Sequence, residues 1–346
     1  MSGSRAASKA AALRWGTRAA GLLVTGIGLY VVAPSLLTVL DAWPSLGDVR
    51  PVWFGLVAVL ELASFACLWV LLRIALGGGR LIDIAASQLA GNAAGKVVPG
   101  GVAAGGVVQA GMLVRAGFTP RKVAGALSAT GLLSTGVLLA LPLLTIPAVL
   151  VGPPPAQELQ LGLVLSSVVA VALIVLGLAL LHWDGLVRAV GLAAGAVVHV
   201  VRRRVSPARV AEVLLAERDQ VATAFRGRWL RSLASAAANR MFDYAALVAA
   251  LHAVGATVRP SLVLVAYVAS LALGMIPITP GGLGFVETGL TTLLVLAGTS
   301  TDQAVVATLL YRLASFWVPI PLGALAWGGW QASRRRQPRA PADSGR

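Results

Sequence analysis

The sequence predicts an all-α polytopic membrane protein with about six full transmembrane helices and two re-entrant helical hairpins in an inverted repeat. Three observations lead to this prediction. Hydrophobic residues make up 58% of the 346 residues and charged residues only 12%, a balance that the core of a soluble protein cannot use. Several apolar runs reach the roughly 20 residues that a helix needs to cross the hydrocarbon core. Two more apolar runs are interrupted by Pro-Gly-Gly, at 99–101 and 280–282.

The uninterrupted apolar runs define the complete spans. The first follows a basic N-terminal segment, residues 1–16, and resembles a signal peptide in outline. Because this run is too long and Pro34 follows its best small-residue cleavage site, we expect an uncleaved span. By the same hydropathy criterion we expect spans at about 17–38, 52–74, 123–147, 160–181, 231–253 and 304–329.

The two interrupted runs occupy about residues 82–117 and 261–298. Each arm has about 16 residues and would measure about 24 Å as a helix, which is shorter than the roughly 30 Å core. A hairpin that enters and leaves on one side of the membrane fits both runs. Proline ends the incoming arm, and glycine supplies the turn. The outgoing arms begin at Gly101 and Gly282, where free amides and the positive helix end attract anions.

The two hairpin regions align with each other at a constant offset. Their Pro-Gly-Gly turns match, and so do the Ala-Gly pairs at 116–117 and 297–298. Arg121 begins the span after the first hairpin, whereas Asp302 begins its counterpart. These opposite charges predict halves inserted in opposite orientations. The two turns would then approach the middle of the membrane, as in transporters whose broken helices line a central cavity.

Basic residues predict the orientation. Of the 28 Lys and Arg residues, Arg50 and Arg259 fall on the outer side and Lys96, Arg240 and Arg312 fall at membrane depth. The others fall on the side that the positive-inside rule assigns to the cytoplasm. The net charge of +15 is therefore explained by membrane orientation, and no nucleic-acid partner is expected. We expect a bacterial-type cytoplasmic (plasma) membrane with both termini in the cytoplasm.

Two extramembrane segments complete the predicted organisation around a transmembrane domain at about residues 17–330. Residues 182–230 form a cytoplasmic amphipathic connector whose apolar face lies on the membrane. Binding of anionic lipid heads by Arg202, Arg203 and Arg204 is the alternative role of this connector. Residues 331–346 are predicted to be a basic disordered tail.

Polar residues at membrane depth are the candidate substrate-binding residues, because charges there are costly unless they are paired or hydrated. Lys96 either lines the cavity with Asn92, one helical turn away, or extends to the membrane surface. Arg312 either binds substrate or pairs with Glu287. The full candidate set is Asn92, Lys96, Pro99, Gly100, Gly101, Arg240, Asp243, Pro280, Gly281, Gly282, Glu287, Tyr311 and Arg312.

Several polar residues allow a structural interpretation or have no assigned role. Arg240 and Asp243 are spaced to pair across one helical turn. Gln109 faces either the cavity or a neighbouring helix, and Glu61 has no assigned role. Cys67 is the only cysteine and the histidines are scattered, so we expect no metal, no cofactor and no catalytic residue.

Three motifs resemble a known family. PITPGGLGFVE at 277–287, YRLASFWVPIPLG at 311–323 and GNAAGKVVPGG at 91–101 resemble the flippase-like transmembrane region of lysylphosphatidylglycerol synthetases. The resemblance covers nearly the whole chain and implies movement of aminoacylated phospholipid between leaflets. No aminoacyl-transfer domain follows the last span, so a stand-alone member is expected and aminoacyl transfer is not implied. The first hairpin reads PGGVAAGG, without the acidic residue that members often carry after this turn.

The leading functional prediction is a lipid translocase, not an enzyme, that moves or binds an anionic phospholipid or a polyprenyl-phosphate lipid. One alternative is a secondary transporter of a small anion, coupled through Glu287 and Asp243. Another is a non-transporting membrane partner of a lipid-modifying or cell-envelope enzyme. Homodimer formation stays open. An intramembrane enzyme is disfavoured because the sequence has no nucleophile–base pair and no HExxH motif.

Overall fold

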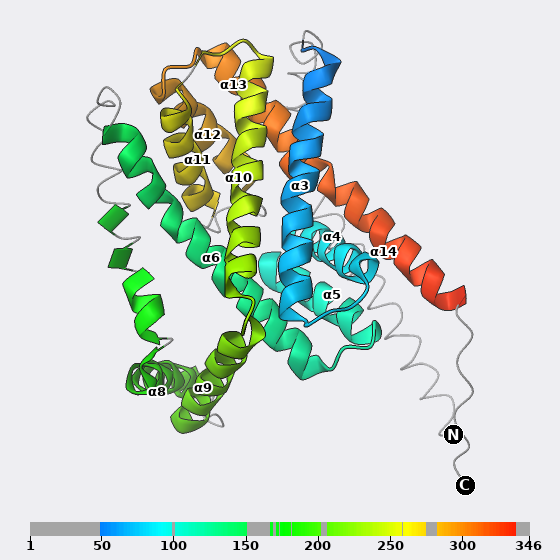
Figure 1. Cartoon of the computed structure of the whole chain (residues 1–346), viewed down its shortest axis with the longest axis vertical. Helices are drawn as coiled ribbons and strands as arrows, with labels where there is room; N and C mark the ends of the chain where they lie inside the picture. The colour runs from blue at the N-terminus through cyan, green and yellow to red at the C-terminus, as the bar shows by residue number, and fades with distance from the viewer. Residues whose placement is uncertain are drawn as a thin grey trace, which may run out of the picture.

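A computed structural model describes residues 49–98, 101–150, 167–168, 171–172, 174–180, 182–201, 206–257, 259–274 and 282–336. All regular secondary structure in these ranges is helical (Figure 1). In chain order the elements are α3 (Pro51–Ala75), α4 (Leu81–Val97), α5 (Gly101–Arg115), α6 (Pro120–Leu150), α8 (Asp184–Val201), α9 (Pro207–Ala224), α10 (Trp229–Ala253), α11 (Pro260–Gly274), α12 (Phe285–Leu296), α13 (Thr301–Arg312), the π-helical turn η2 (Leu313–Trp317) and α14 (Pro319–Arg336).

Three helices of the described part are long and apolar enough to cross a membrane. They are Pro51–Ala75, Pro120–Leu143 and the continuous segment Thr301–Arg334. They coincide with the predicted spans at 52–74, 123–147 and 304–329. A bent pair, Ile174–Leu180 and Asp184–Ala196, makes a fourth if it is counted as one span.

The other predicted segments have different outcomes. The span at 231–253 forms the 25-residue helix α10 but interrupts its apolar surface with charged residues. The segments 1–16 and 17–38 and half of 160–181 lie outside the described residues. The prediction that residues 331–346 are disordered is wrong for 331–336, because α14 continues to Arg336.

Large apolar side chains on these helices face outward. Val107 is 73% exposed, Leu325 is 71% exposed and Leu62 is 57% exposed. In water such surfaces would promote aggregation, whereas in a bilayer they contact acyl chains. The chain is therefore a helical membrane protein.

Helices α3 and α10 lie side by side and run in opposite directions (Figure 1). At their middle, the Asn239 side-chain amide donates to the Ser64 carbonyl at 3.1 Å and to the Ser64 hydroxyl at 2.7 Å. Near one end, the rings of Trp53 and His252 stack with centroids 6.5 Å apart. Both Ser64 and Asn239 are buried, so this polar contact fixes the register of the two helices within an apolar environment.

The first interrupted run folds as a tight antiparallel pair, α4 and α5. A Cβ atom on Gly105 would lie 2.4 Å from the Gly91 carbonyl oxygen, and one on Gly95 would lie 3.3 Å from the Gly101 carbonyl oxygen. Only glycine permits this approach of two backbones, which is the usual way that membrane helices pack closely. On the other side of α4, a Cβ atom on Gly323 of α14 would lie 2.3 Å from the Leu89 carbonyl oxygen.

The second interrupted run also folds back on itself, as α11 and α12. Gly289 of α12 packs against Leu273 of α11. The chain enters α12 through Gly282 and Gly284, whose φ angles are 71° and 77°. Side chains other than glycine rarely adopt this conformation, so both glycines are required by the turn.

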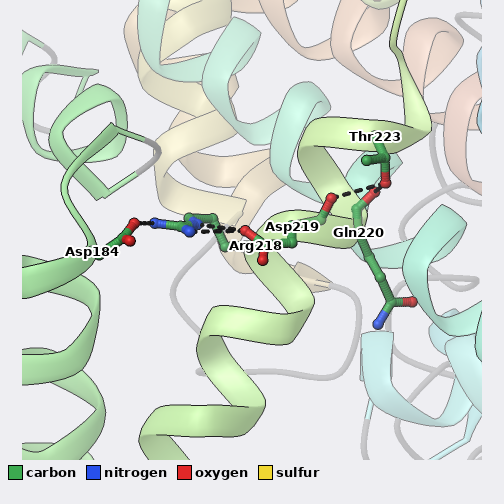
Figure 2. A network of polar contacts seen from close by, with 5 residues as sticks. All are labelled: Asp184, Arg218, Asp219, Gln220 and Thr223. Atoms are coloured by element: carbon green, nitrogen blue, oxygen red, sulfur yellow. Dashed lines mark hydrogen bonds and ion pairs between the residues drawn. The ribbon is translucent and has the colours of Figure 1, made fainter.

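Basic residues collect where α3 and α5 end and where α6 and α10 begin, and we call this region the basic end. The antiparallel helices α8 and α9 lie beside it (Figure 1). Gly191 and Gly195 let α8 pack directly on Ala211 and Pro207 of α9. Arg218 of α9 then joins Asp184, at the start of α8, to Asp219 (Figure 2).

The close packing of α4 on α5 predicts a difference between neighbouring glycines. Gly105→Ala overpacks the pair and costs about 1–3 kcal/mol. Gly106→Ala has nothing within 4 Å of its new Cβ and gains up to about 1 kcal/mol of helix propensity. We expect a lower thermal midpoint for Gly105→Ala and an equal or higher one for Gly106→Ala, measured in detergent by size-exclusion after heating. Equal midpoints for the two variants would contradict this packing.

Candidate functional site

The site is organised by the π-helical turn η2 between α13 and α14. Pro319 has no amide hydrogen, so the Ser315 carbonyl four residues earlier loses its helical partner. The chain compensates locally with a wider turn, in which the Val318 amide donates to the Leu313 carbonyl at 2.9 Å. Short π-helical segments within longer helices often occur at functional sites.

Lys96, near the end of α4, binds the carbonyls that this turn exposes. Its Nζ donates to the Ser315 carbonyl at 2.9 Å and to the Phe316 carbonyl at 3.2 Å. The same Nζ lies 4.8 Å from the centroid of the Phe316 ring. Lys96 therefore points into the protein and does not extend to the membrane surface.

Arg312 ends α13 and pairs with Glu287 in the first turn of α12. Its Nε and one terminal nitrogen each lie 2.8 Å from the Glu287 Oε1. Its guanidinium carbon also lies 4.5 Å from the centroid of the Phe316 ring. Lys96 and Arg312 thus both contact Phe316, which is 3% exposed. The Arg312–Glu287 pair that the sequence suggests as one alternative is confirmed.

Asp243 of α10 lies between two tyrosines from other helices. The Tyr267 hydroxyl donates to its Oδ2 at 2.7 Å, and the Tyr311 hydroxyl donates to its Oδ1 at 2.8 Å. All three residues are buried. The ion pair between Arg240 and Asp243 that their spacing allows does not form, because both Asp243 oxygens are directed toward α11 and α13.

Glu61 of α3 lies beside this group. It is 6% exposed, and its Oε1 has no hydrogen-bond partner among the described residues. The charged groups that act on it are Asp243 of α10 and Lys96 of α4. A buried carboxyl group with a free oxygen is unusual and suggests a functional role.

Arg240 lies one turn from Asp243 on α10. Its Nε is enclosed and has no hydrogen-bond partner in the described part of the chain. The positive charge of Arg240 acts on the Tyr267 hydroxyl. We call the group Glu61, Lys96, Arg240, Asp243, Glu287 and Arg312 the central charged cluster. Its three formal positive charges equal its three formal negative charges.

The structure brings some of the predicted site residues together and leaves others apart or outside the described residues. Lys96, Arg240, Asp243, Glu287, Tyr311 and Arg312 are brought together in or beside the cluster. Asn92 lies one turn before Lys96, half-buried, with an Oδ1 that has no partner among the described residues. Gly101 begins α5 as predicted, whereas Gly282 lies in the turn before α12, which begins at Phe285. Pro99, Gly100, Pro280 and Gly281 lie outside the described residues.

The structure also shows residues that the sequence analysis missed. Glu61, Tyr267 and Phe316 all contribute to the cluster or support it. The two prolines at 319 and 321 mark a break in the last span, and this break could have drawn attention to Phe316 beside it. Gln109 packs against Gly91 of α4, so it faces the neighbouring helix.

The described residues contain no group of three or more His, Cys, Asp or Glu side chains arranged to hold a metal ion. The cluster instead places cations and aromatic faces around a break in a helix. Such an arrangement can bind an anionic group, because the cations are desolvated and held in position.

Comparison with known proteins decides the family. The model described as the lysylphosphatidylglycerol synthase TM region matches residues 18–323. The chain belongs to this family. The UPF0104 membrane protein PH1989 of Pyrococcus horikoshii is 41% identical over 63 residues, which are 18% of this chain and 19% of that protein. Membership of the lysylphosphatidylglycerol synthase transmembrane-region family confirms the resemblance drawn from the three motifs.

The tyrosine contacts of Asp243 predict a specific loss of stability. Tyr311→Phe removes one donor from a buried carboxyl group, which costs about 1–3 kcal/mol. The matched control is Tyr244→Phe, whose hydroxyl donates to the Pro260 carbonyl at a more exposed position. We expect the first variant to lower the thermal midpoint by several degrees more than the second. Equal losses would show that the Asp243 contact contributes nothing of its own.

Proposed function

We propose that the protein binds the polar head of an anionic phospholipid or polyprenyl-phosphate lipid and moves it between leaflets. The observation that supports this most is the state of two intramembrane cations. Lys96 binds only backbone carbonyls and a ring face, and Arg240 has an enclosed Nε with no hydrogen-bond partner among the described residues. Cations held this way are available to a phosphate oxygen. Arg312 instead positions α12 through Glu287.

The proposed membrane arrangement has six spans and two re-entrant hairpins of opposite orientation. The arms α4, α5, α11 and α12 have 17, 15, 15 and 12 residues. At 1.5 Å per residue they would be about 18–26 Å long, too short for a core of about 30 Å. The pair α4–α5 contacts η2 through Lys96, and the pair α11–α12 contacts Arg312 through Glu287. This supports two hairpins that meet inside the membrane.

The proposed location is the cytoplasmic membrane, with the basic end in the cytoplasm. The arginines at the ends of α3 and α5 and at the start of α10 support this orientation. No covalent chemistry is proposed for the cluster, since its cations and carboxyl groups are arranged for binding and for charge balance.

Lipid movement requires the cluster to open. Glu61, Tyr311 and Phe316 are 6%, 7% and 3% exposed, so a headgroup reaches them only when the surrounding helices separate. The turn η2 is the natural place for bending. Acyl chains can remain in the bilayer throughout, because only the headgroup needs the polar path.

A proteoliposome assay with a fluorescent anionic lipid tests this function. The protein should accelerate the movement of fluorescent lipid from the inner to the outer leaflet, where a membrane-impermeant quencher can reach it. Lys96→Met and Arg240→Met should each reduce that rate by about tenfold or more, the effect of one lost charge-assisted contact. The matched control is Arg50→Gln, because Arg50 lies at the end of the molecule opposite the basic end. No acceleration with any anionic or polyprenyl-phosphate lipid would reject translocation.

A second candidate function is coupled transport of a small water-soluble anion. The observation that favours it is Glu61, a buried carboxyl group with one unpartnered oxygen beside Asp243. Such a pair can carry a proton between the two sides. Flux of a water-soluble anion that follows a pH gradient, and that is lost in Glu61→Gln, would favour this function over lipid movement.

A further inference from the structure

A hollow region lies at the basic end, built from residues that the central charged cluster does not use. Two adjoining hollows of about 380 Å³ and 650 Å³ share Ile74, Gly77 and Arg228 in their walls. The remaining walls come from the end of α3, the starts of α6 and α10 and the end of α9. We call these two hollows together the basic hollow.

The walls of the basic hollow carry five cationic side chains and no carboxylate. The cations are Arg73, Lys122, Arg226, Arg228 and Arg231. Within the described part of the chain, none of these five side chains makes an ion pair or a hydrogen bond. Like charges collected around one concavity repel each other, and an anion bound there relieves that repulsion.

The nearest carboxylate in the sequence of α9 is already engaged. Asp219 directly precedes the wall residue Gln220 and accepts from Arg218 at 2.8 Å. Arg218 has Asp184 as its other partner (Figure 2). Arg218 thus neutralises Asp184 and Asp219, and the wall cations have no ion-pair partner among the described residues.

The positive-inside rule alone does not explain this arrangement. That rule requires basic residues in the segments on one side of the membrane, but not their convergence on a hollow without carboxylates. The hollow lies where α3 ends and α10 begins, and the proposed membrane arrangement puts this end at the level of lipid headgroups. Its walls also include the apolar Val70, Ile74 and Ala126, which suit the glycerol and first acyl carbons of a lipid.

We propose that the basic hollow is a binding site for a phosphate group, separate from the central charged cluster. Guanidinium groups hold phosphate oxygens in pairs, and Lys122 adds a compact point charge. Basic pockets between membrane helices are a common mode of binding anionic headgroups. The same chemistry is offered by a lipid phosphate and by free phosphate, and the apolar wall residues favour the lipid.

The test uses the full chain in detergent and measures bound lipid by native mass spectrometry. The probe is phosphatidic acid, with phosphatidylcholine as the zwitterionic comparison. Arg228→Gln with Arg231→Gln should weaken phosphatidic acid binding by about tenfold or more, the effect of lost charge-assisted hydrogen bonds. Arg50→Gln with Arg259→Gln removes the same charge from the other end and should bind as the unchanged protein does. Arg228→Lys with Arg231→Lys keeps the charge but loses the paired hydrogen bonds, so its binding should lie between that of the unchanged protein and that of the Arg→Gln variant.

Additional measurements identify the source of the phosphate and separate this proposal from the translocation proposal. Inorganic phosphate or pyrophosphate that displaces the lipid would support a phosphate site open to both sources. Displacement by neither would support a site specific for lipid. The loss caused by Arg228→Gln with Arg231→Gln should be of the same size in a Lys96→Met background, whether or not translocation is observed. Equal weakening in the two Arg→Gln double variants, or none in Arg228→Gln with Arg231→Gln, would overturn the proposal.

Discussion

The holding of buried charged side chains by partners on other helices is the constraint on which the rest of the structure depends. The central charged cluster places three cations and three carboxyl groups among apolar helices, where an unbalanced charge costs several kcal/mol. The balance is made between segments far apart in sequence. Glu287 reaches Arg312, Lys96 reaches the Ser315 carbonyl, and Asp243 takes its donors from α11 and α13. The helix arrangement is therefore set as much by these contacts as by apolar packing.

A break in a helix lowers the energetic cost of burying these charged side chains, because it supplies free backbone partners. A continuous helix satisfies its own carbonyls and offers nothing to a ligand, whereas Pro319 frees the Ser315 carbonyl and creates an acceptor for Lys96. The turn η2 can bend without disturbing α3 and α10, which are joined through Asn239 and Ser64. A rigid helix pair beside a bendable turn suits the opening of a polar path that is proposed above.

The sequence predicted the features that depend on composition and local breaks. Long apolar runs became α3, α6 and the α13–α14 segment, and the interrupted runs became antiparallel pairs. The Arg312–Glu287 contact followed from topology. The partners of Asp243 and the burial of Glu61 were not predictable, because they depend on how α3, α10, α11 and α13 rotate about their own axes. The spacing of Arg240 and Asp243 suggested a local pair, but Tyr267 and Tyr311 from other helices took both carboxyl oxygens.

The central claim is that the two broken helix pairs are held together by charged contacts at the π-helical turn, and a double-mutant cycle on Glu287 and Arg312 tests it most directly. The free energy of unfolding is measured for Glu287→Gln, Arg312→Gln and the double variant. Each single variant leaves a buried charged partner without its ion pair. The sum of the two single losses of unfolding free energy should therefore exceed the loss in the double variant by about 1–3 kcal/mol. Strictly additive losses would contradict the account, because they would mean that the two side chains do not depend on each other.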